Sequence, residues 1–344
     1  MSYNDVNLEL LQKAAEEGDA EAQKNLGKRY YYGDGVEQDY VKAFEWTEKA
    51  AEQGYALAQY NLGIMYEDGF GVGQDYAKAF EWWQKAAEQG YASAQYNLGY
   101  MYDNGQGVEH DYVKAVEWYQ KAADQGYAKA QNNLGAMYDN GEGVEQDYIK
   151  AVEWYKKAAE QGHASAQSNL GYMYDNGQGV EQDYVKAIEW YQKAAEQGNA
   201  IAQSNLGVIY EFGQGVEQDY AKAVEWYKKD AEQGHASAQY NLGVMYDNGE
   251  GVEQDYAKAV EWYQKAAEEG HADARLNLGY MYEKGRGIEQ DYVKAMEWYQ
   301  KAAEHGNASA QYNLGNMYVY GEGVEQDYAK AVEFYTKLAL LGLN

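Results

Sequence analysis

Small and apolar residues recur along the chain with a period of 36 residues, and no insertion or deletion interrupts the pattern. Each of nine copies opens on a glycine, and the positions of every copy are numbered here from that residue. The copies begin at Gly18, Gly54, Gly90, Gly126, Gly162, Gly198, Gly234, Gly270 and Gly306. A fixed period of this length predicts a solenoid, in which each unit packs only against its neighbours.

Each copy predicts two helices, because its apolar residues are spaced for one helical face. Helix A is expected over about positions 3 to 15, and helix B over about positions 22 to 35. In the third copy, the apolar residues of helix A are Ala92, Ala94, Leu98, Met101 and Tyr102. Those of helix B are Tyr112, Ala115, Val116, Tyr119, Ala122 and Ala123.

Glycine and aspartate mark the ends of these helices. The opening glycine suits a left-handed C-terminal cap of helix B, and the glycine at position 16 does the same for helix A. The aspartate at position 22, Asp111 in the third copy, is placed to cap helix B. The glycine at position 10 lies inside helix A, where it costs about 1 kcal/mol relative to alanine. Its recurrence predicts the close approach of a neighbouring helix.

Aromatic residues also recur in rows. We interpret the rows of Trp at position 29 and Tyr at positions 13, 23 and 30 as packing residues.

The two ends depart from the repeat. Residues 3–17 align with helix B of a missing copy, which predicts an N-terminal capping helix over 1–17 and one continuous solenoid over 18–341. A tail of residues 342–344 follows. Leucines replace small or polar residues at Leu338, Leu340, Leu341 and Leu343. A terminal repeat usually presents a polar outer face, so this end indicates either local packing or end-to-end self-association.

The charge of the chain narrows the choice of partners. The net charge is -28 and is spread over the copies, most of which carry about five acids and two lysines. Nucleic-acid binding needs a basic footprint, and anionic membranes repel an acidic surface like this one.

The chain has no cysteine, which excludes disulfides and thiolate metal sites. Neither a signal peptide nor a long apolar segment is visible, so we expect a cytoplasmic protein.

One repeat motif resembles a known family. It reads A-x-x-x-L-G-x-M-Y, then G-x-G-V, then D-Y-x-K-A-x-E-W-Y-x-K-A-A-E-x-G, and it covers residues 18–341. It is similar to the Sel-one-like repeat, a relative of the tetratricopeptide repeat. The resemblance implies an all-α, right-handed α-solenoid of helix-turn-helix repeats, with helix A lining the concave side and a role as adaptor or scaffold. A cysteine-rich bacterial branch of that family is linked to penicillin binding, but its cysteines are missing here.

The positions that vary between copies predict a recognition surface. Positions 4, 7 and 11 change freely and share one face of helix A. Tyrosine, which is enriched in interface hot spots, recurs there at Tyr60, Tyr96, Tyr100, Tyr172, Tyr240, Tyr280 and Tyr312. The alternative is an exposed face under no constraint.

Two further rows flank this face. Position 8 is always asparagine, and its candidates are Asn97, Asn133, Asn169, Asn205 and Asn241. These amides either connect adjacent repeats or bind the backbone of an extended peptide. Position 14 is mostly acidic, and its candidates are Asp103, Asp139 and Asp175. Tyrosine beside carboxylate suits a peptide that carries Lys or Arg; the alternative is a solvated acid near the helix end.

No catalytic or metal centre is evident, and no cofactor is expected. His163, His235 and His271 come one per repeat and do not cluster as metal ligands. No Ser-His-Asp set or phosphate loop is present. Asp230 replaces an alanine of helix B, and Arg275 replaces a glutamine of helix A; the sequence explains neither.

The sequence therefore favours a non-enzymatic protein-interaction scaffold whose helix A face binds an extended, basic or neutral peptide segment. An alternative is a structural or self-assembling array, designed or amplified from a consensus, without an evolved ligand. A third hypothesis, a hydrolase of the cell-wall or β-lactam type, rests on family analogy alone. The absence of cysteine and of a nucleophile–base pair argues against it.

Overall fold

The computed structural model describes the backbone of residues 3–341 and the side chains of residues 8–339. The described chain is helical, with short loops and no strand. Its helices are α1 (Tyr3–Glu16), α2 (Ala20–Tyr32), α3 (Tyr40–Glu52), α4 (Ala56–Asp68), α5 (Tyr76–Glu88), α6 (Ala92–Asn104), α7 (Tyr112–Asp124), α8 (Ala128–Asn140), α9 (Tyr148–Glu160), α10 (Ala164–Asn176), α11 (Tyr184–Glu196), α12 (Ala200–Phe212), α13 (Tyr220–Ala231), α14 (Ala236–Asn248), α15 (Tyr256–Glu268), α16 (Ala272–Lys284), α17 (Tyr292–Ala303), α18 (Ala308–Tyr320) and α19 (Tyr328–Leu341).

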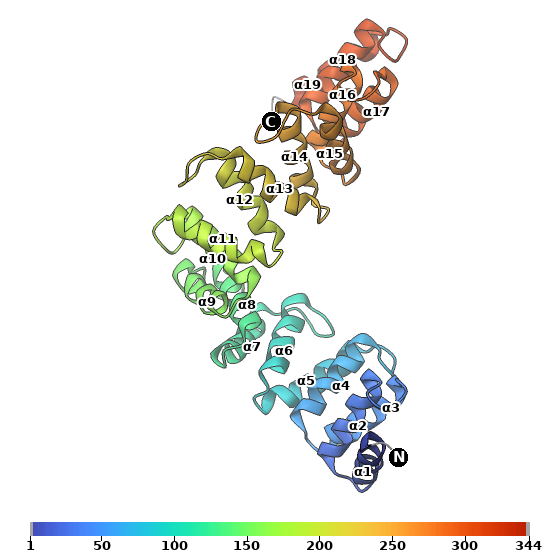
Figure 1. The fold of residues 1–344 in the computed structure, drawn as a ribbon, viewed down its shortest axis with the longest axis vertical. Coiled ribbons are helices and arrows are strands. Elements are labelled where there is room, and N and C mark those ends of the chain that lie inside the picture. The colour runs from blue at the N-terminus through green and yellow to red at the C-terminus, as the bar shows by residue number, and fades with distance from the viewer. Residues whose placement is uncertain (1–2, 342–344) are drawn as a thin grey trace. The chain divides into compact units, whose positions relative to one another are not determined.

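The chain forms two compact units, Met1–Gln182 and Asp183–Asn344. The first contains α1 to α10 and the second α11 to α19, so the boundary falls between the two helices of the fifth copy. Within each unit, every helix packs against the next one along the chain (Figure 1). The prediction of an all-α array of helix pairs is confirmed.

The third copy shows why the helices begin and end where they do. Its helix A, α6, covers positions 3 to 15 as predicted, and its helix B, α7, begins one residue later than expected. The Asp111 carboxylate caps α7 by accepting the backbone N–H of Lys114 at 3.1 Å. Gly105 ends α6 in the left-handed region, at φ 64°, and its N–H donates to the Met101 carbonyl.

The core of each copy is built from alanine, leucine and one aromatic ring. Ala115, Ala122, Leu98 and Tyr119 are completely buried in the third copy. A Cβ added to Gly99, at position 10, would lie 2.5 Å from Cδ1 of Tyr119. The predicted close approach is therefore confirmed, and the neighbour is the Tyr119 ring from helix B of the same copy.

A ladder of buried glutamines, which was not predicted from the sequence, joins successive copies. The Gln95 amide donates to the Ala87 carbonyl at 3.1 Å. Its side-chain oxygen accepts the Gln125 amide at 2.7 Å. Arg275 occupies the same position in the eighth copy, and its Nε donates to the Ala267 carbonyl at 3.1 Å. This substitution, unexplained by the sequence, therefore preserves one rung of the ladder.

The two ends are described unequally. Leu11 and Ala15 of α1 pack against Leu26 of α2, whereas Leu10 is 65% exposed. At the other end, Leu338 is half-buried, and the side chains of Leu340, Leu341 and Leu343 lie outside the described residues. No helix in the described range is long and apolar enough to cross a membrane.

Candidate functional site

The predicted tyrosines of helix A divide into an exposed and a half-buried group. Tyr100 in α6 and Tyr172 in α10 both hold position 11 of their copies, and they are 42% and 47% exposed. Tyr312 in α18 holds position 7 of the last copy and is 52% exposed. Tyr280 is half-buried, and the guanidinium of Arg286 lies 5.4 Å from its ring centroid. The exposed rings are available for contact with a partner.

The other tyrosines at position 7 are Tyr60, Tyr96 and Tyr240, and each packs against a ring of the next copy. The Tyr96 ring centroid lies 5.8 Å from that of Tyr119 and 5.3 Å from that of Tyr127 in the next copy. Tyr240 stacks on His271 with centroids 4.6 Å apart. Burial is the main cause that raises the pKa of Tyr60 to about 12. These rings connect adjacent repeats and expose only part of their surface.

The asparagine and acid rows meet at the buried tyrosine of position 30. The Tyr119 hydroxyl donates to the Asp103 carboxylate at 3.0 Å and accepts the Asn133 amide of the next copy at 3.1 Å. Tyr155 donates to Asp139 in the same way, at 3.3 Å. Burial raises the pKa of Asp103 above its usual value. Here the asparagine connects adjacent repeats, which is the first of the two roles considered for that row.

The remaining predicted residues of these rows occupy equivalent positions. Asn97 bonds to Tyr60, and Asn241 bonds to Tyr227. Asn169 donates to the side-chain oxygen of Asn132 at 3.2 Å. Asn205 lies in α12, at position 8 of its copy, and Asp175 lies in α10, at position 14 of its copy.

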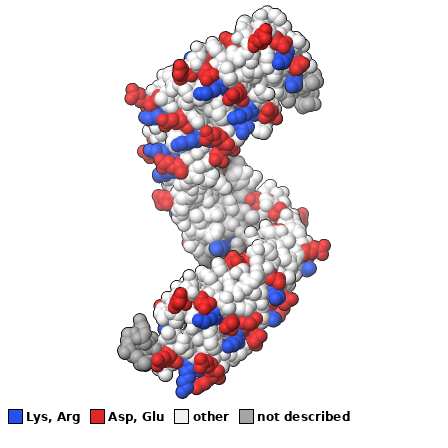
Figure 2. All heavy atoms as spheres, turned by 90° about the vertical axis from the view of Figure 1, so that its right-hand side faces the viewer, with Lys and Arg blue, Asp and Glu red and all other residues white. Residues whose placement is uncertain are grey.

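Helix B presents a mixed-charge surface whose lysines are engaged within the chain. Lys114 lies 3.2 Å from the Asp111 carboxylate and 5.2 Å from the Tyr102 ring centroid. Lys121 lies 3.8 Å from the ring centroid of Trp118, and the same Trp–Lys pair recurs along the chain. Figure 2 shows basic atoms interspersed with acidic ones, with no area of basic residues alone on the visible face. This surface offers no basic footprint for nucleic acid.

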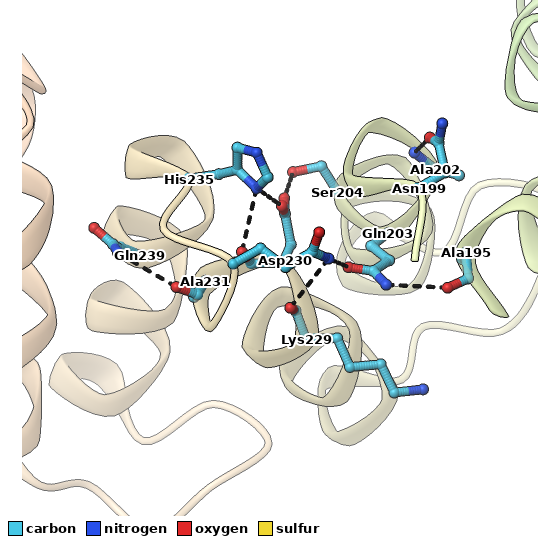
Figure 3. A network of polar contacts seen from close by, with 11 residues as sticks. Ala195, Asn199, Ala202, Gln203, Ser204, Lys229, Asp230, Ala231, His235 and Gln239 are labelled. Carbon is cyan, nitrogen blue, oxygen red and sulfur yellow. Dashed lines mark hydrogen bonds and ion pairs between the residues drawn. The ribbon is translucent and has the colours of Figure 1, made fainter. Parts of the chain in front are cut away.

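Asp230 lies at the centre of a polar network in the second unit (Figure 3). It is 2% exposed and stands where seven other copies have alanine. The Ser204 hydroxyl donates to its Oδ2 at 2.6 Å, and Nδ1 of His235 lies 2.6 Å from its Oδ1. The carboxylate thus lies between the serine and the histidine, so the cluster lacks the nucleophile–base contact of a hydrolase. The serine hydroxyl satisfies one oxygen of this buried acid, and the other oxygen lies beside His235 without a hydrogen bond.

The described side chains contain no group of three or more His, Asp or Glu that could hold a metal ion.

Comparisons with known proteins agree with this architecture. The model of the Sel1 repeat family matches ten consecutive segments: 8–19, 20–55, 56–91, 92–127, 128–163, 164–199, 200–235, 236–271, 272–307 and 308–343. A solved structure of a protective antigen present in uropathogenic Escherichia coli strains, displaying an SLR fold, is 39% identical with a TM-score of 0.81; the match covers 96% of this chain and 79% of that chain.

A Sel1 repeat protein from Oxalobacter formigenes is 37% identical with a TM-score of 0.72, and the match covers 91% of each chain. The comparison with curated proteins gives no match. Because the ten matched segments follow one another from residue 8 to residue 343, the chain belongs to the Sel1 repeat family.

Proposed function

We propose that this protein is an interaction scaffold whose helix A face binds an extended segment of a partner protein. Sel1 repeat proteins are generally protein-interaction scaffolds and are typically not enzymes. The observation that carries the proposal is the exposure of Tyr100 and Tyr172, which lie on helix A of two copies in the first unit. Exposed tyrosine is a common anchor in protein interfaces.

The proposed partner segment is basic or neutral. The chain has 56 acidic and 28 basic residues. The basic residues on helix B already lie beside carboxylates or aromatic rings, as Lys114 and Lys121 do. A partner that carries Lys or Arg would meet uncompensated acids and exposed tyrosine rings, which attract cations.

Within this proposal, the asparagine and acid rows support the surface instead of forming it. Asn133 and Asp103 both bond to the buried Tyr119, which fixes the spacing between α6, α7 and α8. The exposed tyrosines then stand on a frame that is already rigid, so binding orders few additional groups.

Selection from a displayed library of random 16-residue peptides tests the proposal. We expect the enriched peptides to contain Lys and Arg and to avoid Asp and Glu. They should lose affinity for the double variant Tyr100→Ala and Tyr172→Ala. The matched control is Val113→Ala and Ile149→Ala, which removes exposed apolar side chains from helix B of the same unit and should retain binding. Equal binding to both double variants would refute the helix A face as the site.

A further inference from the structure

The first copy lacks the aromatic ring that every later copy places between helix A and helix B. Position 30 is Thr47 in the first copy, Trp83 in the second and tyrosine in the other seven. These tyrosines are Tyr119, Tyr155, Tyr191, Tyr227, Tyr263, Tyr299 and Tyr335. The copies therefore provide an internal comparison of the same site with and without its ring.

A pocket of about 280 Å³ lies where the ring is missing. It lies between α2, α3 and α4, and it is lined by Lys28, Tyr31, Thr47, Asn61, Ile64 and Met65, among others. Thr47 fills only the part of this space next to Gly27. Its Oγ1 would lie 2.6 Å from a Cβ added to Gly27, just as the Tyr119 ring would lie close to a Cβ added to Gly99. An apolar cavity of about 150 Å³ is large enough to bind benzene in another protein, so this pocket can hold a substituted ring.

The third copy shows what such a ring would contact. There the Tyr119 hydroxyl accepts the Asn133 amide and donates to Asp103. The equivalent of Asn133 in the pocket is Asn61, whose side chain makes no hydrogen bond within the described part of the chain. The equivalent of Asp103 is Tyr31, so the acid is absent, and Lys28 adds a cation to the lining.

We infer that this pocket binds an aromatic ring that carries an oxygen opposite its point of attachment, as in a 4-hydroxyphenyl group. Apolar side chains and Gly27 enclose the ring, and the Asn61 amide donates to the oxygen. Because Lys28 lines the pocket and no carboxylate does, an anionic oxygen is accepted as well. Lys28 and Ile64 of this lining hold position 11 of the proposed helix A face. The inference does not rest on peptide binding, since a small phenol alone is enough to test it.

The test uses p-cresol, which is the tyrosine side chain as a free molecule, and follows binding to the full chain by calorimetry and NMR. We expect one saturable site, with toluene roughly fivefold weaker because it cannot accept the Asn61 hydrogen bond. Thr47→Tyr fills the pocket and should abolish binding. Thr47→Phe serves the same purpose if the first variant does not fold. Binding that survives in a folded filled variant, or no binding to the unmodified chain, would overturn the inference.

Two matched variants sharpen the test. Asn61→Leu keeps the pocket but should remove the preference for p-cresol over toluene. Tyr119→Thr should create a second p-cresol site in the third copy, and this site should reject 4-methylbenzoate because Asp103 lines it. The original pocket should accept 4-methylbenzoate, and its rejection there would contradict the assigned role of Lys28.

A final arm distinguishes the two sources of such a ring. The probe is acetyl-Gly-Tyr-Gly-amide, compared with p-cresol on the unmodified chain and on Thr47→Tyr. Tighter binding of the peptide to the unmodified chain assigns the pocket to a tyrosine of a partner protein, and weaker binding assigns it to a small phenol. Both results support the inference provided that Thr47→Tyr removes the binding.

Discussion

The first and third copies share one framework but use it differently. In the third copy, Tyr119 fills the space between helix A and helix B and joins Asp103 to Asn133. In the first copy, Thr47 leaves a pocket of about 280 Å³ in the same place. The comparison teaches that one substitution in a packing row is enough to convert a core position into a candidate binding site.

The largest effect is expected from exchanging the residues at position 30. Tyr119→Thr should lower the free energy of unfolding by about 3 kcal/mol, because it removes a buried ring and leaves a cavity. Thr47→Tyr should raise it by about 1 kcal/mol, because it fills a cavity that already exists. Urea unfolding followed by circular dichroism measures both changes. Destabilisation by Thr47→Tyr would show that the pocket is not shaped for the ring.

Gly99→Ala should have the next largest effect. Its added Cβ would lie 2.5 Å from the Tyr119 ring, and such overpacking costs about 1–3 kcal/mol. Gly73→Ala is the matched control, because no atom lies within 4 Å of a Cβ at that position. A shift of the urea midpoint in both variants, or in neither, would argue against tight packing as the reason for glycine at position 10.

Two aspartates of the third copy should respond to pH in opposite directions. Burial raises the pKa of Asp103, whereas the hydrogen bond from the Lys114 backbone N–H lowers the pKa of Asp111. Because the pKa of Asp103 is raised in the folded state, its ionisation destabilises the fold, and this destabilisation develops as pH rises toward the folded pKa. Because the pKa of Asp111 is lowered in the folded state, its ionised form stabilises the fold near neutrality, and this stability is lost as pH falls through the folded pKa.

The measurement is urea unfolding between pH 3 and pH 6. Relative to the unmodified chain, Asp103→Asn should become more stable as pH rises, and Asp111→Asn should become less stable. Asparagine keeps an acceptor oxygen at both positions, so the comparison isolates the charge. The same pH trend in both variants would contradict the assigned pKa directions.

The sequence predicted the backbone of the repeat well, because its signals are local. The helix A bounds, the Asp111 cap and the glycine at the end of α6 all depend on residues within a few positions of one another. The close approach at Gly99 was also predicted, since an unfavourable residue repeated nine times requires a packing reason.

The side-chain networks were harder to predict, because their partners lie far apart in the sequence. Gln95 and Gln125 are 30 residues apart, and Asp230 meets Ser204 across 26 residues. The exposure of Tyr100 against the partial burial of Tyr96 depends on the position of the next copy. The pocket did leave a signal, since Thr47 interrupts the aromatic row in the same copy in which Tyr31 interrupts the acid row.

The central claim is that the repeating residues make the fold and that the varying tyrosines of helix A make the binding surface. Its most direct test is calorimetric titration of one library-selected peptide into the unmodified chain and into the Tyr100→Ala and Tyr172→Ala double variant. We predict affinity at least tenfold weaker for the double variant, at an unchanged thermal unfolding midpoint. Equal affinity for the two proteins would contradict the claim.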